Sequence, residues 1–129
     1  MQVPDLSAFE TMARDAIEAL PEVFRTPARA ILLQVTDWPD AAMLADLEID
    51  DALNLTGLYD GIPMTEKALS DPSPWPDTIW LFREPILQEW RERGNVELSE
   101  LIAHVVVHEL AHHFGWSDDD IARIDRWWE

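Results

Sequence analysis

The sequence predicts an α+β fold in which helices cover one face of a small sheet. Apolar residues repeat at helical spacing near the amino terminus and again over residues 101–114. Three short apolar or β-branched runs lie between these two segments, and each has the length of a strand. All four histidines fall within the second helical segment. We therefore expect that helix to be the element around which the fold is arranged.

Length and composition indicate one folded domain over residues 1–129. A chain of this length can bury a proper core, and 47% hydrophobic residues with seven tryptophans argue against disorder. No repeat, low-complexity tract or linker divides the chain. Cysteine is absent, so neither disulfides nor thiolate metal ligands are available.

The charge balance argues against two classes of binding partner, nucleic acids and anionic membranes. The chain has 26 acidic residues and nine basic ones, for a formal net charge of −17. Nucleic acids and anionic membranes would repel such a protein, so we expect neither as a partner. The amino terminus has no signal-peptide pattern, and no apolar run is long enough to span a bilayer. A cytoplasmic location is therefore expected.

The first half of the chain predicts two helices and two strands. Ser7–Glu10 has the pattern of a capping box, and a helix is expected from there to Pro21. Residues 22–28 are expected to be an irregular link, and residues 31–35 a buried strand. A short helix over 41–47, with Asp40 as its cap, precedes a second strand over 55–59 that Asp60–Gly61 ends.

The second half predicts a loop, a strand and three helices. Three prolines within residues 71–77 require a loop, and the β-prone run 78–82 is the third strand. A helix over 86–93 begins near Glu84–Pro85 and ends at Gly94–Asn95. Ser99 is the expected cap of the histidine-bearing helix, and Ser117–Asp120 opens a last helix.

The histidine-bearing helix contains the sequence His108-Glu109-Leu110-Ala111-His112, an H-E-x-x-H motif. A helix turns about 100° per residue, so His108 and His112 share one face and can present two imidazoles to one ion. Glu109 lies beside them, near a water bound to that ion. The helix is apolar almost all round, which predicts burial, and buried polar groups need partners. The motif therefore predicts a zinc site, and the alternative is a core histidine pair bonded to carbonyls or water.

Asp118 is the expected third zinc ligand. Gly115 lets the chain turn sharply after the helix, so that a residue three positions later can return over the metal. Asp118 also suits the first turn of the next helix, which is a structural reason for an acid there. Glu97 and Glu100, which precede the histidine-bearing helix, are alternative ligands.

The two remaining histidines have other expected roles. His104 and His112 lie about 12 Å apart along the helix axis, so both reach one ion only with strained geometry. We expect His104 to act at a cleft mouth or in a hydrogen bond, or to be a satisfied core histidine. His113 points about 100° away from His112 and is expected to be structural.

Three segments together resemble the small bacterial minimal zincin metallopeptidase-like family. They are residues 57–63 (GLYDGIP), 78–87 (TIWLFREPIL) and 108–118 (HELAHHFGWSD). The resemblance implies a compact α+β zincin fold with a short mixed sheet over the active-site helix. It also implies a metal site of the form H-E-x-x-H-x-x-G-x-x-D, here His108, His112 and Asp118. No methionine follows Met64, so the methionine turn of larger relatives is missing.

These features predict a zinc-dependent peptidase that acts on a peptide or protein substrate. Glu109 would take a proton from the zinc-bound water and later pass it to the leaving amine. If strand 78–82 is an exposed edge beside the helix, an extended peptide would bind there by strand addition.

Two alternatives remain open at this point. A bacterial zinc endoribonuclease of rRNA maturation has the same ligand spacing, H-x-x-x-H-x-x-x-x-x-H. It lacks a glutamate after its first histidine, however, and must hold RNA, so Glu109 and the charge of −17 speak against it. The second alternative is a non-catalytic zincin scaffold that binds metal or another protein, which the small size and the missing cleft-closing subdomain favour.

Overall fold

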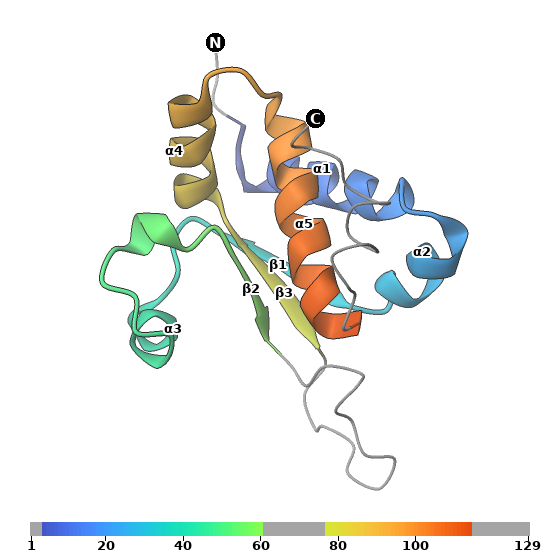
Figure 1. The fold of residues 1–129 in the computed structure, drawn as a ribbon, viewed down its shortest axis with the longest axis horizontal. Coiled ribbons are helices and arrows are strands. Elements are labelled where there is room, and N and C mark those ends of the chain that lie inside the picture. Colours follow the sequence, from blue (N-terminus) through green and yellow to red (C-terminus); the bar gives the residue numbers. More distant parts are fainter. Residues whose placement is uncertain (1–3, 61–76, 115–129) are drawn as a thin grey trace, which may run out of the picture.

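The computed structural model describes residues 4–60 and 77–114, with side chains up to Ala111 (Figure 1). The helices and strands are α1 (Leu6–Glu18), α2 (Glu22–Ala28), β1 (Leu32–Thr36), α3 (Ala41–Asp46), the 3₁₀ helix η1 (Ala52–Asn54), β2 (Gly57–Asp60), β3 (Thr78–Phe82), α4 (Arg83–Arg93) and α5 (Leu98–Phe114). This order of helices and a small sheet confirms the predicted α+β class.

The three strands form one mixed sheet in the order β1-β3-β2. β3 pairs with β1 in parallel and with β2 in antiparallel orientation. Peptide binding along strand 78–82 required that strand to be an exposed edge; this condition is not met, because β3 is the central strand. Its sequence is consistent with that place, since Ile79, Leu81 and Phe82 are almost fully buried, as central strands usually are. The edge strand that contacts α5 is β2.

Helices α1 and α5 cover one face of this sheet. They pack against each other, with α1 also contacting β1, and α5 contacting β2 and β3 (Figure 1). The core between these layers is apolar; it includes Phe9, Ala13 and Ile17 of α1, Leu33, Ile79 and Leu81 of the sheet, and Leu101, Ile102, Val106 and Leu110 of α5. Helix α5 is thereby packed against α1 on one side and against the sheet on another. This packing fixes which of its residues point away from the core.

The amino-terminal helix begins differently from the prediction. The Asp5 carboxylate accepts a hydrogen bond from the backbone N–H of Ala8 at 2.9 Å, so Asp5 is the cap and Ser7 lies inside the first turn. Asp5 offers the same kind of side-chain acceptor as the expected cap Ser7, two residues earlier. The capping-box pattern at Ser7–Glu10 favoured the wrong one of the two. The helix ends at Glu18, before Pro21.

The expected irregular link at residues 22–28 is wrong, because these residues form helix α2. Pro21 precedes the helix, and its carbonyl accepts hydrogen bonds from the N–H groups of Phe24 and Arg25. Pro27 lies near the carboxyl end, where a proline removes one hydrogen bond without dividing a longer helix. Arg29 pairs with Glu18 through two hydrogen bonds and joins the end of α2 to α1.

Most other element boundaries agree with the sequence. Asp40 caps α3 by accepting from the Met43 N–H at 2.8 Å, and Gly94 ends α4 with a positive φ of 72°. Helix α5 begins at Leu98, so Ser99 is not its cap; the carbonyl of Glu97 accepts the first hydrogen bonds. The proline-rich residues 71–76 and the expected last helix lie outside the described residues. Over the described ranges, no helix is long and apolar enough to cross a membrane.

Candidate functional site

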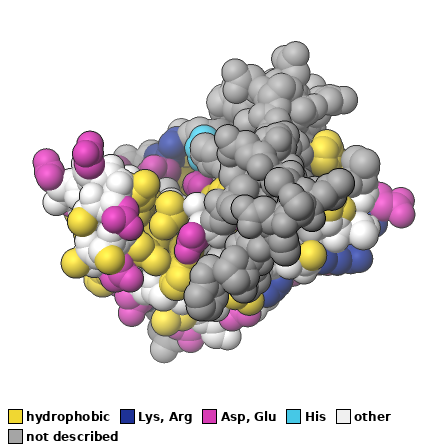
Figure 2. Space-filling view, turned by 90° about the horizontal axis from the view of Figure 1, so that it is seen from below, with side chains coloured by type: hydrophobic (Ala, Val, Ile, Leu, Met, Phe, Trp, Pro, Cys, Tyr) yellow, Lys and Arg dark blue, Asp and Glu magenta, His cyan; other side chains and the backbone are white. Residues whose placement is uncertain are grey.

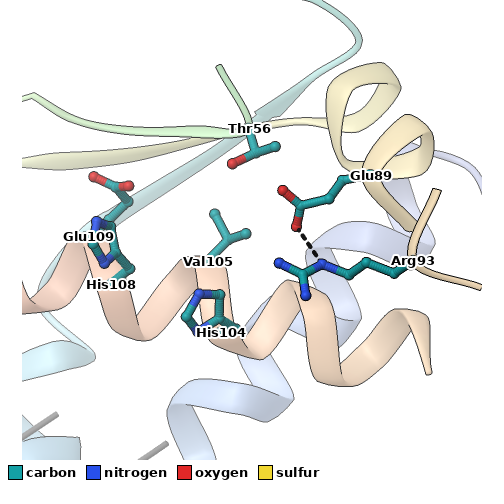
Figure 3. A pocket seen from close by; sticks show the side chains of 7 residues that line it. All are labelled: Thr56, Glu89, Arg93, His104, Val105, His108 and Glu109. Atoms are coloured by element: carbon teal, nitrogen blue, oxygen red, sulfur yellow. Dashed lines mark hydrogen bonds and ion pairs between the residues drawn. The ribbon is translucent and has the colours of Figure 1, made fainter. Parts of the chain in front are cut away.

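Helix α5 turns His108 and Glu109 toward different surroundings (Figure 3). His108 is exposed, whereas only 9% of Glu109 is accessible to solvent. Adjacent helical residues point about 100° apart, so one residue can face the surface while the next faces the sheet. His112 follows one helical turn after His108 in the backbone of α5. The side chain of His112, and the whole of Asp118, lie outside what the structure describes.

Strand β2 passes α5 at Gly57, where its backbone lies close against side chains of the helix. A Cβ atom at Gly57 would lie 2.6 Å from Cγ1 of Val105 and 3.4 Å from Cγ of Glu109. Only glycine leaves room for this crossing. Sequence reasoning missed Gly57 as a functional residue, although an isolated glycine within a strand pattern is a known signal of close backbone approach.

The carboxylate of Glu109 accepts a hydrogen bond from the backbone N–H of Tyr59. The ladder between β2 and β3 explains why this donor is available. Phe82 donates to the carbonyl of Thr56 at 3.0 Å, so in this antiparallel pair the groups of Gly57 and Tyr59 point away from β3. No described strand pairs with that outer side of β2. Glu109 therefore lies at an edge where a further strand can add.

Burial changes the acidity of Glu109. Loss of hydration disfavours the charged carboxylate and raises the pKa of Glu109 to about 7, although the Tyr59 N–H acts in the opposite direction. A carboxyl group that titrates near neutral pH can both accept and return a proton. The local environment thus suits Glu109 to acid–base chemistry.

A pocket of about 210 Å³ opens beside this carboxyl (Figure 3). Its walls come from α5, from the residue before β2 and from α4; they are Thr56, Glu89, Arg93, His104, Val105, His108 and Glu109. His104 and His108 line it together, with ring centroids 6.2 Å apart. The structure thus brings His104, His108 and Glu109 to one opening.

Of the three predicted metal ligands, His108 is the one whose side chain the structure describes. His108 places an imidazole at the surface of the pocket, next to a buried acid. Among the residues that the structure describes, no group of three histidine, aspartate or glutamate side chains is placed to hold a metal. Glu100 lies in the first turn of α5, about 12 Å along the axis from His108, which is too far for a shared ion.

Comparison with known proteins agrees with this geometry. A family model described as zincin-like metallopeptidase matches residues 28–128. A search of curated proteins finds no match to the chain. The matched segment includes the whole sheet, α4 and α5, and the family implies zinc binding in general. The chain belongs to the zincin-like metallopeptidase family.

Proposed function

We propose that this protein is a zinc-dependent metallopeptidase that hydrolyses peptide bonds with Glu109 as its general base. One observation carries the proposal: a buried carboxyl with a pKa of about 7 lies beside the first histidine of an H-E-x-x-H motif, at an open strand edge. The membership of the chain in a metallopeptidase family supports the same reaction.

His108, His112 and Asp118 are the proposed zinc ligands. When bound, zinc supplies a Lewis acid that polarises the substrate carbonyl and acidifies the attacking water. Helix α5 sets the spacing of the two histidines, since both belong to one continuous helix from Leu98 to Phe114. Asp118 would complete the set from beyond Gly115.

Glu109 moves the proton in this mechanism. Its carboxylate accepts the proton of the attacking water, and the resulting carboxylic acid donates that proton to the leaving amine. Without metal, neither the charged nor the neutral form is strongly favoured near neutral pH, and bound zinc would shift the balance toward the carboxylate that accepts the water proton. Before a peptide binds, the Tyr59 N–H holds the carboxyl group at the strand edge.

The outer edge of β2 is the proposed binding place for the substrate backbone. An extended peptide can pair with the outward N–H and C=O groups of Gly57 and Tyr59 as an added strand. This places the peptide across Glu109, because Tyr59 is the residue that contacts the carboxylate. Strand β3 has no such role, since β1 and β2 occupy both of its sides.

The test combines metal analysis with a digest of a broad peptide library. We expect one zinc per chain in the unmodified protein and in Glu109→Gln, and cleavage only in the former. His108→Ala should lose both zinc and cleavage. Turnover that persists in Glu109→Gln would exclude the mechanism. Stoichiometric zinc without cleavage of any peptide would instead favour a non-catalytic zincin scaffold.

The ribonuclease alternative is not favoured by the pocket. RNA binding needs a groove rich in lysine and arginine. The pocket beside His108 is lined by Glu89 and Glu109, and its arginine, Arg93, is paired with Glu89 at 3.2 Å. An acidic lining of this kind suits a peptide better than a phosphate backbone.

A further inference from the structure

We infer that the pocket beside Glu109 receives a basic side chain, lysine or arginine, from the peptide substrate. The inference rests on the proposed function and specifies the substrate class of the same site. It follows from the position of the pocket, from a second pocket beside it and from the charges of the walls of both.

The position of the pocket matches a residue close to the bond that is cut. His104 lies one turn before His108, about 6 Å along the axis of α5. An extended peptide advances about 3.3 Å per residue, so for a peptide that runs alongside α5 a distance of about 6 Å corresponds to about two residues. Thr56, which directly precedes β2, lines the same pocket (Figure 3). A peptide on the edge of β2 therefore brings a side chain within two residues of the scissile bond to this opening.

A second pocket borders the first one. That second pocket has a volume of about 250 Å³ and lies between α4 and η1. The two share Thr56 and Glu89 in their walls. Asp51 and Glu92 line the second pocket, at the far side from Glu109. A lysine or arginine side chain entering past His104 would carry its charge toward these carboxylates.

The charges on the walls favour a cation. Glu89 is paired with Arg93, and both side chains are about one-third exposed. Glu92 accepts a hydrogen bond from the neutral amide of Gln88 at 3.1 Å, and Asp51 accepts one from the backbone N–H of Leu53. Apart from Glu109, the two pockets thus contain three carboxylates and one guanidinium. A cation is attracted to this lining, whereas an anion would meet three like charges.

The charge of the rest of the surface also favours a basic substrate over an acidic one. The net charge of −17 repels acidic peptides at long range. Acidic side chains are scattered over the face shown in Figure 2, among hydrophobic ones. An apolar substrate side chain would gain no ion pair and would displace water from Glu89 and Arg93 without replacing its hydrogen bonds. A basic side chain is therefore the best match.

The test compares matched peptides that differ only in charge, at each of the two positions on either side of the cleaved bond. The zinc-loaded full chain is assayed for kcat/KM with lysine, norleucine and glutamate at each position. We expect lysine to be preferred over norleucine at one position, and glutamate to be the poorest. Glu89→Gln should lower the lysine preference about two- to fivefold, the size expected for a solvent-accessible ion pair.

Arg93→Gln is the matched variant, because it breaks the same ion pair from the other side. It should raise the lysine preference by releasing Glu89, so the two variants shift specificity in opposite directions. A merely structural role of the Glu89–Arg93 pair would make both variants lose activity with every peptide alike. Glu10→Gln, which removes an exposed acid on α1, controls for net charge.

Binding separates this inference from the proposed reaction. Fluorescence anisotropy with Glu109→Gln protein measures the affinity for lysine and norleucine peptides without any cleavage. Tighter lysine binding that depends on Glu89 would support the basic pocket even if no peptide is hydrolysed. A preference for glutamate or norleucine, equal binding of all three, or no binding at all would overturn it.

Discussion

The backbone N–H of Tyr59 in an edge strand donates to the carboxylate of Glu109 on the buried helix α5. This one hydrogen bond joins the two elements that the proposed reaction needs, the acid–base group and the substrate-binding edge. It depends on the close crossing at Gly57, two residues earlier in β2. The predictions below begin from these contacts.

Replacing Gly57 with alanine should disturb this crossing. The added methyl would lie 2.6 Å from Val105, so β2 must move away from α5. We expect a loss of about 1–3 kcal/mol in the free energy of unfolding, measured in urea, and a fall in peptidase kcat. Gly94→Ala is the control, because its positive φ of 72° also resists alanine but its surroundings are open. That variant should lose about 1 kcal/mol of stability with kcat unchanged. Equal kcat in both variants would argue against a role for the crossing.

The metal-free protein should become less stable as the pH rises toward neutrality, because of Glu109. Its carboxyl has a pKa of about 7 when folded and an ordinary value of 4.5. The folded state therefore holds the proton more tightly, and this stabilisation is fully present below pH 4.5 and lost through pH 7. The difference corresponds to about 3 kcal/mol. Glu109→Gln removes this dependence, so the variant should gain stability over the unmodified protein between these pH values. Parallel curves for the two proteins would contradict the raised pKa.

Zinc binding should release a proton from Glu109. A nearby cation favours the charged carboxylate, so binding lowers a pKa that burial has raised. At pH 6.5 much of the Glu109 population is protonated, given a pKa of about 7. Calorimetry in buffers of different ionisation enthalpy should detect up to about one more released proton in the unmodified protein than in Glu109→Gln. Removal of zinc with a chelator should abolish cleavage, and added zinc should restore it. An equal proton count in both proteins would place the metal away from Glu109.

Asp5→Ala should destabilise helix α1, which packs against α5, without changing any residue of the candidate site. Asp5 caps α1, which packs directly against α5. Loss of this cap should cost about 1 kcal/mol in thermal or urea unfolding. Ser7→Ala is the matched control, since Ser7 lies inside the helix and is exposed, and its stability should change little. If Ser7→Ala is the more harmful substitution, the cap assignment is wrong.

Local patterns predicted the elements better than their arrangement. The β-prone run at Thr78–Phe82 and the stop at Gly94 were correct because each depends on residues close in sequence. The order β1-β3-β2 was not predictable, since strand neighbours depend on contacts between distant segments. Helix α2 has only seven residues, with Pro21 before it and Pro27 near its end, and so short a segment carries little helical periodicity in its sequence.

In the candidate site, too, features set by nearby residues were predicted and contacts between distant segments were not. Spacing along one helix was sufficient to propose the face shared by His108 and His112. The hydrogen bond from Tyr59 to Glu109 joins residues 50 positions apart. The pocket wall likewise brings Thr56 and His104 together with α4 from separate parts of the sequence. Gly57 could have been found from the sequence, because a glycine within a strand is a local signal. No local pattern indicated that Glu89 or Arg93 would line the pocket.

The hydrogen bond between Tyr59 and Glu109 also bears on solubility. An edge strand with unoccupied donors is a template on which further copies of a chain can pair and aggregate. In β2 the outward donor of Tyr59 is engaged by a side chain of the same molecule. A peptide must therefore exchange one hydrogen bond for another at this position, and backbone pairing alone gives little net gain. The edge thus discriminates against strands that offer only a backbone, including the edge of a second copy.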